Sequence, residues 1–168
     1  MRYVVIDPSG SFNEGKGHTG IAIMHDDKWN EIGVRDFHAK DYDTRYKYWR
    51  DIIEYVMLGK AVYGFETTVI IESFTIRTDG ILMGKMPETI QLIGALVYEL
   101  DKWGIPYVFQ TPAQAKSRFK DEILPNYIPG LKRFESGRYS MNGKIINDHQ
   151  RDALKHLLFY KKYKEPKE

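Results

Sequence analysis

The sequence predicts an α/β fold built on a five-stranded mixed sheet, with a three-stranded antiparallel meander, two further parallel strands and helices on both faces. Two short apolar runs, residues 3–6 and 69–71, are typical of strands buried on both faces of a sheet. Segments with apolar residues at helical spacing, notably 44–58 and 88–103, alternate with the later strands. Because helical crossovers join parallel strands, this order indicates the mixed sheet.

The composition fits one domain over residues 1–168, with a charged tail at 161–168 that we expect to fray. Apolar residues make up 42% and aromatic residues 14%, which excludes a disordered chain. A formal net charge of only +2 means that any surface for nucleic acid must be local. The chain has no cysteine, which excludes disulfides and thiolate zinc sites. Without a membrane span or a signal peptide, we expect a cytoplasmic protein with no membrane partner.

The first strand, residues 2–7, is followed by a polar, glycine-rich loop at 8–20. Its segment 10–16 matches most of a phosphate-binding P-loop. However, Gly17 stands where that motif needs a Ser or Thr hydroxyl, and residues 20–24 form a strand where the motif needs a helix. The loop is therefore predicted to join two antiparallel strands, and no nucleotide cofactor is expected.

The third strand is expected at residues 29–37, after a tight turn. The helix at 44–58 should stop at Gly59, and strand four should cover 68–72. These elements complete the meander and return the chain to the sheet beside strand one.

A polar loop at residues 75–87 follows strand four and carries Arg77 and Lys85. Its position beside Glu72 suits contacts with substrate, although an ordinary mobile loop fits equally well. The helix at 88–103 is apolar over more than one face, which indicates burial or an interface between two copies of the chain.

Strand five is expected at 105–110, a third helix at 112–124, a hairpin at 139–146 around Asn-Gly, and a last helix at 148–160. The third helix carries cations that could meet an anionic substrate, namely Lys116, Arg118 and Lys120.

Acidic residues occur at points that this fold would bring together. Asp7 and Glu72 each end an apolar strand, and Asp152 shares a helix face with His149 three residues before it. Asp148 is the expected N-cap of that helix. Three carboxylates and an imidazole without a thiolate suit Mg²⁺ or Mn²⁺, and two such ions serve phosphodiester hydrolysis. Taken singly, these residues also fit turn, cap and surface roles.

Four motifs, in this order and spacing, resemble those of RuvC-type Holliday junction resolvases of the RNase H-like superfamily, in a phage-encoded branch. They are Val-Ile-Asp-Pro at 5–8 with Thr-Gly-Ile-Ala at 19–22, Ile-Ile-Glu-Ser-Phe at 70–74, Thr-Pro-Ala-Gln-Ala-Lys at 111–116 and His-Gln-Arg-Asp-Ala-Leu at 149–154. The loop after the first motif is longer than usual, and residues 125–146 do not resemble the family's usual helix.

The resemblance implies an RNase H-like fold and a homodimer that cuts branched DNA with two Mg²⁺ ions per site, or Mn²⁺. It assigns Asp7, Glu72 and Asp152 as metal-binding acids and Lys116 as the lysine near the scissile phosphate. His149 stands where many members carry Asp and some carry His, and Phe74 stands one position short of a base-wedging aromatic. Cleavage of other branched DNA or of RNA–DNA hybrids, and a catalytically silent DNA-binding module, are the alternatives.

Overall fold

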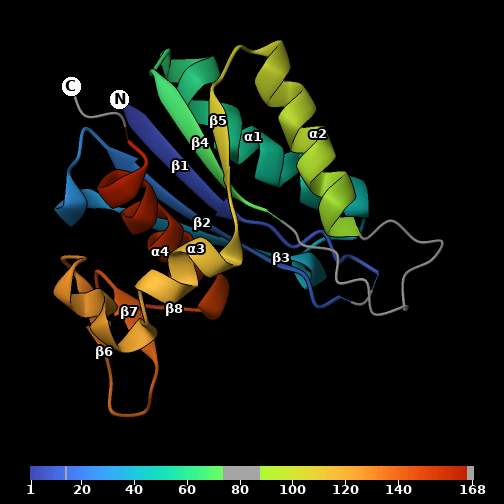
Figure 1. Ribbon diagram of the computed structural model, residues 1–168. Helices are drawn as coiled ribbons and strands as arrows, with labels where there is room; N and C mark the ends of the chain where they lie inside the picture. Colours follow the sequence, from blue (N-terminus) through green and yellow to red (C-terminus); the bar gives the residue numbers. More distant parts are fainter. Residues whose placement is uncertain (14, 74–87, 166–168) are drawn as a thin grey trace.

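The computed structural model describes residues 1–13, 15–73 and 88–165. Within them lies a five-stranded sheet with the order β3-β2-β1-β4-β5 (Figure 1). β1 is antiparallel to β2 and parallel to β4, which is parallel to β5, so the predicted mixed sheet is confirmed. The strands are β1 (Arg2–Asp7), β2 (His18–His25), β3 (Gly33–His38), β4 (Thr67–Glu72) and β5 (Tyr107–Gln110).

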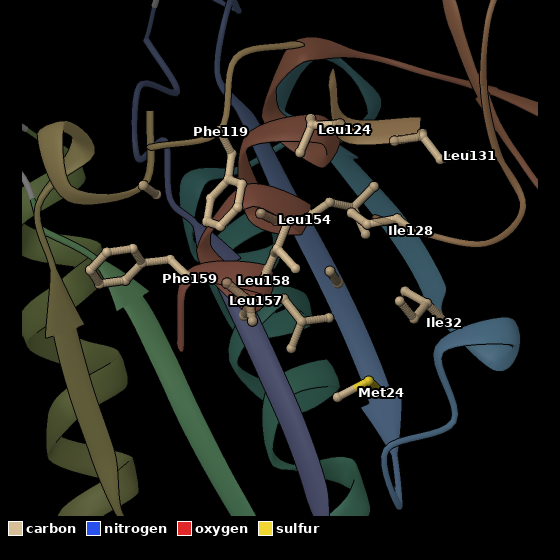
Figure 2. Close-up of a cluster of buried hydrophobic side chains, with 14 of the residues drawn as sticks. Met24, Ile32, Phe119, Leu124, Ile128, Leu131, Leu154, Leu157, Leu158 and Phe159 are labelled. Carbon is tan, nitrogen blue, oxygen red and sulfur yellow. The ribbon is translucent and has the colours of Figure 1, made fainter. Parts of the chain in front are cut away.

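Helices cover both faces of this sheet. On one face lie α1 (Arg45–Tyr63) and α2 (Glu88–Lys102), and on the other lie α3 (Pro112–Arg118) and α4 (Asp148–Tyr163). The apolar run in β1 arises because both faces of this strand are buried, so that alternate side chains enter opposite cores. Val4 packs on the α1–α2 side and Val5 on the α4 side. Figure 2 shows the second of these cores, to which α4 contributes more residues than any other element.

The first helix is longer than predicted, because Gly59 lies inside it instead of ending it. The guanidinium of Arg2 fills the space that a side chain at position 59 would occupy, and its Nη1 donates to the carbonyl oxygen of Val56 at 2.9 Å. Gly64, with a φ of 67°, takes the left-handed conformation that ends α1.

Two other predicted boundaries are wrong. Residues Trp29–Glu31 form a 3₁₀ turn before β3, so the third strand starts later than expected. The third helix ends at Arg118, because Phe119 leaves the helical conformation and is buried in the α4-side core. Another 3₁₀ segment, η3 (Asp121–Asn126), follows and contains Pro125, which cannot donate a helical hydrogen bond.

A second sheet, β6-β7-β8, projects from the domain beside α3 and the start of α4 (Figure 1). Its strands are β6 (Leu131–Arg133), β7 (Tyr139–Met141) and β8 (Lys144–Ile146). The predicted hairpin is confirmed, since Asn142 and Gly143 join β7 and β8 with φ values of 49° and 83°. β6 was not predicted, because three residues with two charges give no strand pattern.

The last helix starts at Asp148, as predicted, but its N-cap and its end differ from the prediction. Asn147, not Asp148, is its N-cap, accepting a hydrogen bond from the backbone N–H of Gln150 at 2.9 Å. The helix continues to Tyr163, three residues into the tail expected to fray. There the half-buried Lys161 pairs with Asp27 at 2.5 Å. No helix among the described residues is long and apolar enough to cross a membrane.

Candidate metal centre

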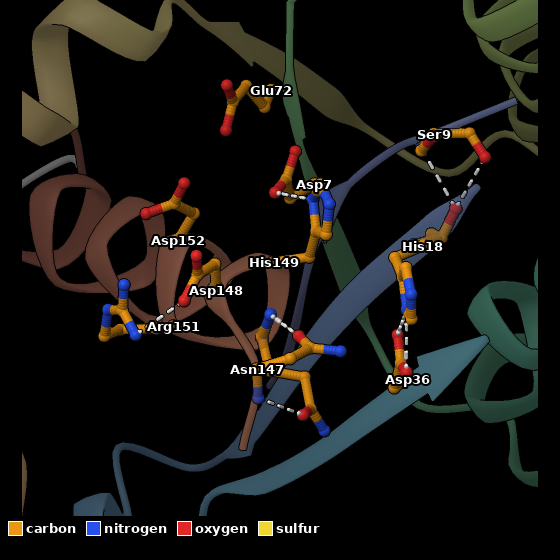
Figure 3. Close-up of polar contacts among 12 residues, drawn as sticks. Asp7, Ser9, His18, Asp36, Glu72, Asn147, Asp148, His149, Arg151 and Asp152 are labelled. Atoms are coloured by element: carbon orange, nitrogen blue, oxygen red, sulfur yellow. Dashed lines mark hydrogen bonds and ion pairs between the residues drawn. The ribbon is translucent and has the colours of Figure 1, made fainter. Parts of the chain in front are cut away.

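Three acidic residues meet where β1 and β4 end, opposite the first turns of α4 (Figure 3). One carboxylate oxygen from each of Asp7, Glu72 and Asp152 lies within 4.8 Å of the others. The parallel pairing of β1 with β4 brings the first two together, and α4 supplies the third. The sequence prediction that these acids converge is therefore confirmed by the geometry.

Gly20 allows α4 to approach the sheet closely enough to deliver its residues. It pairs with Asp7 in the β1–β2 register, and a Cβ at this position would lie 2.2 Å from the carbonyl carbon of His149. Any side chain at position 20 would therefore displace the first turn of α4. The glycine of the Thr-Gly pair in the sequence motif has this packing role.

Lys116 lies between two of the acids. Its Nζ is 2.8 Å from Asp152 Oδ2 and 3.3 Å from Glu72 Oε1. Burial opposes ionisation of the Asp152 carboxyl, but hydrogen bonds from Lys116 and Lys155 outweigh it and lower its pKa. Burial likewise opposes the charge of Lys116, yet the two carboxylates raise its pKa. The cluster therefore holds ionised acids beside a cation.

His149 joins the cluster through Asp7. Its Nδ1 lies 2.7 Å from Asp7 Oδ2, and this hydrogen bond raises the pKa of the imidazole against the effect of burial. Burial, reinforced by the charge of Glu72, raises the pKa of Asp7, while the bond to His149 acts in the opposite direction. The three atoms grouped within 4.8 Å are all carboxylate oxygens, so His149 adjoins that group without being part of it.

A fully buried histidine, which sequence reasoning missed, contacts Glu72 from the interior of the protein. His156 is 0% exposed, with Nε2 2.9 Å from Glu72 Oε2 and Nδ1 2.8 Å from Gln110 Oε1. Burial would raise the pKa of Glu72, but His156 and Lys116 outweigh it and lower the pKa. A histidine that follows Asp152 by four residues on the same helix face was the available signal.

A buried lysine supports Asp152 in a comparable way. Lys155 is 6% exposed, and its Nζ lies 2.8 Å from Asp152 Oδ1 and 2.5 Å from Asp121 Oδ1. Arg151 also binds Asp121 at 2.9 Å, and it binds Asp148 at 3.0 Å. Asp148 is thus an ion-pair partner on the first turn, in place of its predicted role as N-cap. This network fixes η3 against α4 immediately behind the acids.

The acids line a cleft of about 710 Å³. Its other walls come from the loop after β1 and the start of α3, and Lys116 and His149 face it as well. Arg118 lies elsewhere: its guanidinium stacks over Tyr163, eleven residues beyond Asp152 on α4. Lys120 is exposed before η3 and does not line the cleft. Phe74, Arg77 and Lys85 lie outside the described residues.

No family model matches the sequence, and no curated protein matches it either. Solved structures do resemble it, and two of these are of RuvC from Thermus thermophilus. RuvC in complex with a Holliday junction substrate superposes with a TM-score of 0.63 at 15% identity, over 96% of this chain and 92% of that one. A second RuvC structure gives 0.60 at 18% identity, over 96% and 95%. At such identities the likeness concerns architecture, and in architecture the chain has the RuvC fold, as its motifs predicted.

Proposed function

We propose that this protein is a metal-dependent, structure-selective DNA endonuclease of the RuvC type that resolves four-way junctions by paired symmetric nicks. The observation that carries this proposal is the meeting of Asp7, Glu72 and Asp152 within 4.8 Å. The match of nearly the whole chain to a RuvC fold described with a Holliday junction substrate supports it. The four motifs that resemble the family lie on the elements that build this cleft.

The donor set fits hard divalent cations. Three clustered carboxylates without a thiolate suit Mg²⁺ or Mn²⁺, and their mutual repulsion favours a cation between them. Two ions held by Asp7, Glu72 and Asp152 would activate water and stabilise the leaving oxygen of a phosphodiester. We keep His149 in the proposed ligand set because its ring adjoins Asp7. Its Nδ1 is shared with that carboxylate and would have to leave it to coordinate.

The remaining chemistry belongs to the side chains around the acids. Lys116 presents an ammonium group at the mouth of the acid cluster, where it would stabilise the negative charge that develops on the phosphate. His156 and Lys155 hold the carboxylates of Glu72 and Asp152 from the protein side, leaving their other oxygens to the cleft. The acids are thereby oriented before substrate arrives.

The proposed partner is branched DNA, bound by a homodimer that supplies two such sites. Substrate contacts by Phe74, Arg77 and Lys85 stay predictions, as do contacts by Arg118 and Lys120 from outside the cleft. A cytoplasmic location, that of the host if the gene is phage-encoded, also stays a prediction. No nucleotide cofactor and no membrane partner enter the proposal.

The test is a panel of labelled four-way, three-way, flap and linear duplex DNA, and an RNA–DNA hybrid, each with Mg²⁺, Mn²⁺ or chelator. We expect paired nicks in the four-way junction, none in chelator, and none by Asp7→Asn, which should still bind the junction. Equal cleavage of flaps and three-way junctions, or of the hybrid, would favour the broader nuclease. Binding without cleavage under every metal condition would favour a silent DNA-binding module, and cleavage in excess chelator would refute the metal site.

A further inference from the structure

The small β6–β8 sheet carries a concentration of unpaired positive charge. Residues 131–146 contain four cations and one acid, Glu135, a net charge of +3, which exceeds the +2 of the whole chain. The cations are Lys132, Arg133, Arg138 and Lys144. The rest of the described chain is therefore slightly acidic, and this sheet is its local basic surface.

These cations differ from many others in the described chain in having no acidic partner. Lys132, Arg133 and Lys144 are exposed and make no ion pair with a described residue, and Arg138 donates only to Ser136 Oγ at 3.3 Å. On the body of the domain, exposed lysines form local pairs such as Lys47–Asp43 at 2.8 Å and Lys102–Glu99 at 3.3 Å. Unneutralised cations on a projecting sheet attract polyanions.

The sheet is also placed beside the candidate metal centre. The ring of Tyr139 on β7 lies under the guanidinium of Arg151, 4.7 Å from its centroid, and Arg151 directly precedes Asp152. Ile146, which pairs with Tyr139, is six residues before Asp152, a path of roughly 13 Å at ordinary strand and helix rises. The β6–β7 hairpin lies beside α3 and the start of α4 (Figure 1), the two helices that carry Lys116 and Asp152 of the cleft.

We propose that the β6–β7 hairpin, residues 131–141, binds the phosphodiester backbone of a duplex DNA arm. One phosphate of this arm lies in the cleft, and the hairpin contacts the phosphates beyond it. This rests on the proposed function and names the surface that holds the substrate. Duplex DNA carries one phosphate charge per ~1.7 Å of axis, so an arm leaving the cleft presents several phosphates within the reach of the hairpin. Phe134 at the tip is 45% exposed between Arg133 and the turn, which adds an aromatic surface to the cations.

The experiment compares two variants with the same loss of charge. The hairpin variant is Lys132→Gln/Arg133→Gln/Arg138→Gln. The matched control is Lys28→Gln/Lys60→Gln/Lys102→Gln. These three lysines lie near the opposite end of the sheet, where β1 and β5 begin. Binding of a four-way junction and of a linear duplex is measured in Ca²⁺ over a series of salt concentrations. Circular dichroism checks that both variants fold, and single substitutions at the three hairpin positions give an independent series.

We expect the hairpin variant to bind both DNAs about tenfold to several hundredfold more weakly at 0.1 M salt. The slope of log K against log salt should fall by about 0.9 for each cation removed, and the control should change little. Equal effects of the two variants would show only a loss of net charge and overturn the proposal. If the wild-type protein cleaves the junction and the hairpin variant binds DNA as tightly as wild type, the hairpin proposal is overturned and the proposed function stands. Wild-type protein that binds no DNA would defeat both.

Discussion

Lys116 illustrates how one side chain can serve two states of the candidate site. In the structure its ammonium group neutralises Glu72 and Asp152, and in the proposed reaction it would face a phosphate. We expect Lys116→Ala to slow single-turnover cleavage of a four-way junction by about 10²-fold or more, because the lost charge stabilises the transition state. Junction affinity should change little. Lys28→Ala, at an exposed lysine near the opposite end of the sheet, is the control. Equal losses of rate and affinity would make Lys116 a plain phosphate contact.

His156 gives a prediction that does not depend on turnover. Replacing it with Phe keeps an aromatic ring but leaves Glu72 Oε2 and Gln110 Oε1 without their imidazole neighbour. Loss of such a supporting contact lowers metal affinity by about 10- to 100-fold. Calorimetric titration with Mn²⁺ measures this, with His25→Phe at the far end of β2 as the control. Unchanged Mn²⁺ affinity in a folded His156→Phe protein would contradict the positioning role.

The acids and Lys116 were predictable because strand ends, helix spacing and family motifs all mark them. Lys155 and His156 were not predicted, because they lie among the buried residues of α4. The spacing of His156 from Asp152 marks a shared helix face but does not reveal its contact with Glu72. Their role becomes visible only when Glu72 and Asp121 arrive from other elements. Sequence spacing identifies residues that share an element, whereas long-range pairs depend on how the elements pack.

At the scale of elements, η3 is attached to α4 by a small ion network. Asp121 binds both Arg151 and the buried Lys155, and although burial opposes its ionisation, these cations lower its pKa. We expect Asp121→Asn to lower the free energy of unfolding at pH 7 by about 1–2 kcal/mol. Because the folded pKa lies below the unfolded value of about 3.9, the carboxylate stabilises the fold above that pH.

This contribution is lost as the pH falls through the lowered pKa of folded Asp121. Urea unfolding from pH 7 down to about pH 2 should therefore show the two proteins converge in acid. The control is Asp43→Asn, whose pair with Lys47 is exposed and should matter little. A difference between wild type and Asp121→Asn that stays constant over this pH range would show that the charge does not stabilise η3.

Most elements were predicted in the right order, because the pattern of apolar residues in the sequence reflects which side chains each strand or helix buries. Boundaries failed where one contact overrode local preference. Gly59 continues α1 because Arg2 fills its empty side, and Phe119 ends α3 by entering the core. In both cases the contacting residues, Arg2 for Gly59 and the α4 residues of that core for Phe119, lie far away in the sequence. β6 escaped notice because its pairing with β7, and not its own composition, makes it a strand.

At the scale of the molecule, the proposed dimer stays a prediction. The structure limits which residues of α2 are available for its interface. All three leucines of α2 are buried in the domain core, so the excess apolar character of this helix is largely used within one chain. Its outward apolar residue is Tyr98, which is 66% exposed. A dimer that uses α2 would therefore be disrupted by Tyr98→Glu sooner than by a leucine substitution.

The described residues of each chain contain one cluster of acids, which leads to a prediction for mixed dimers. Light scattering should first show that the wild-type protein is a dimer. Dimers of wild-type and Asp7→Asn chains would have one working site and bind junctions normally, since the change removes a carboxylate and no cation. On a cruciform plasmid they should give nicked circles, whereas wild-type dimers give linear product. Linear product from mixed dimers within one binding event would mean that one chain cuts both strands.

The position of α4 in the chain links the integrity of the protein to its chemistry. This helix follows every strand of both sheets, supplies much of one core and carries Asp152 and His149. A chain interrupted before it, by a premature stop or by a protease, would lose the third acid together with the cover of one sheet face. The fragment would be unable to cut DNA and would expose apolar surface that degradation machinery recognises. Under the proposed function, loss of α4 is therefore expected to leave an inactive fragment and not an unregulated nuclease.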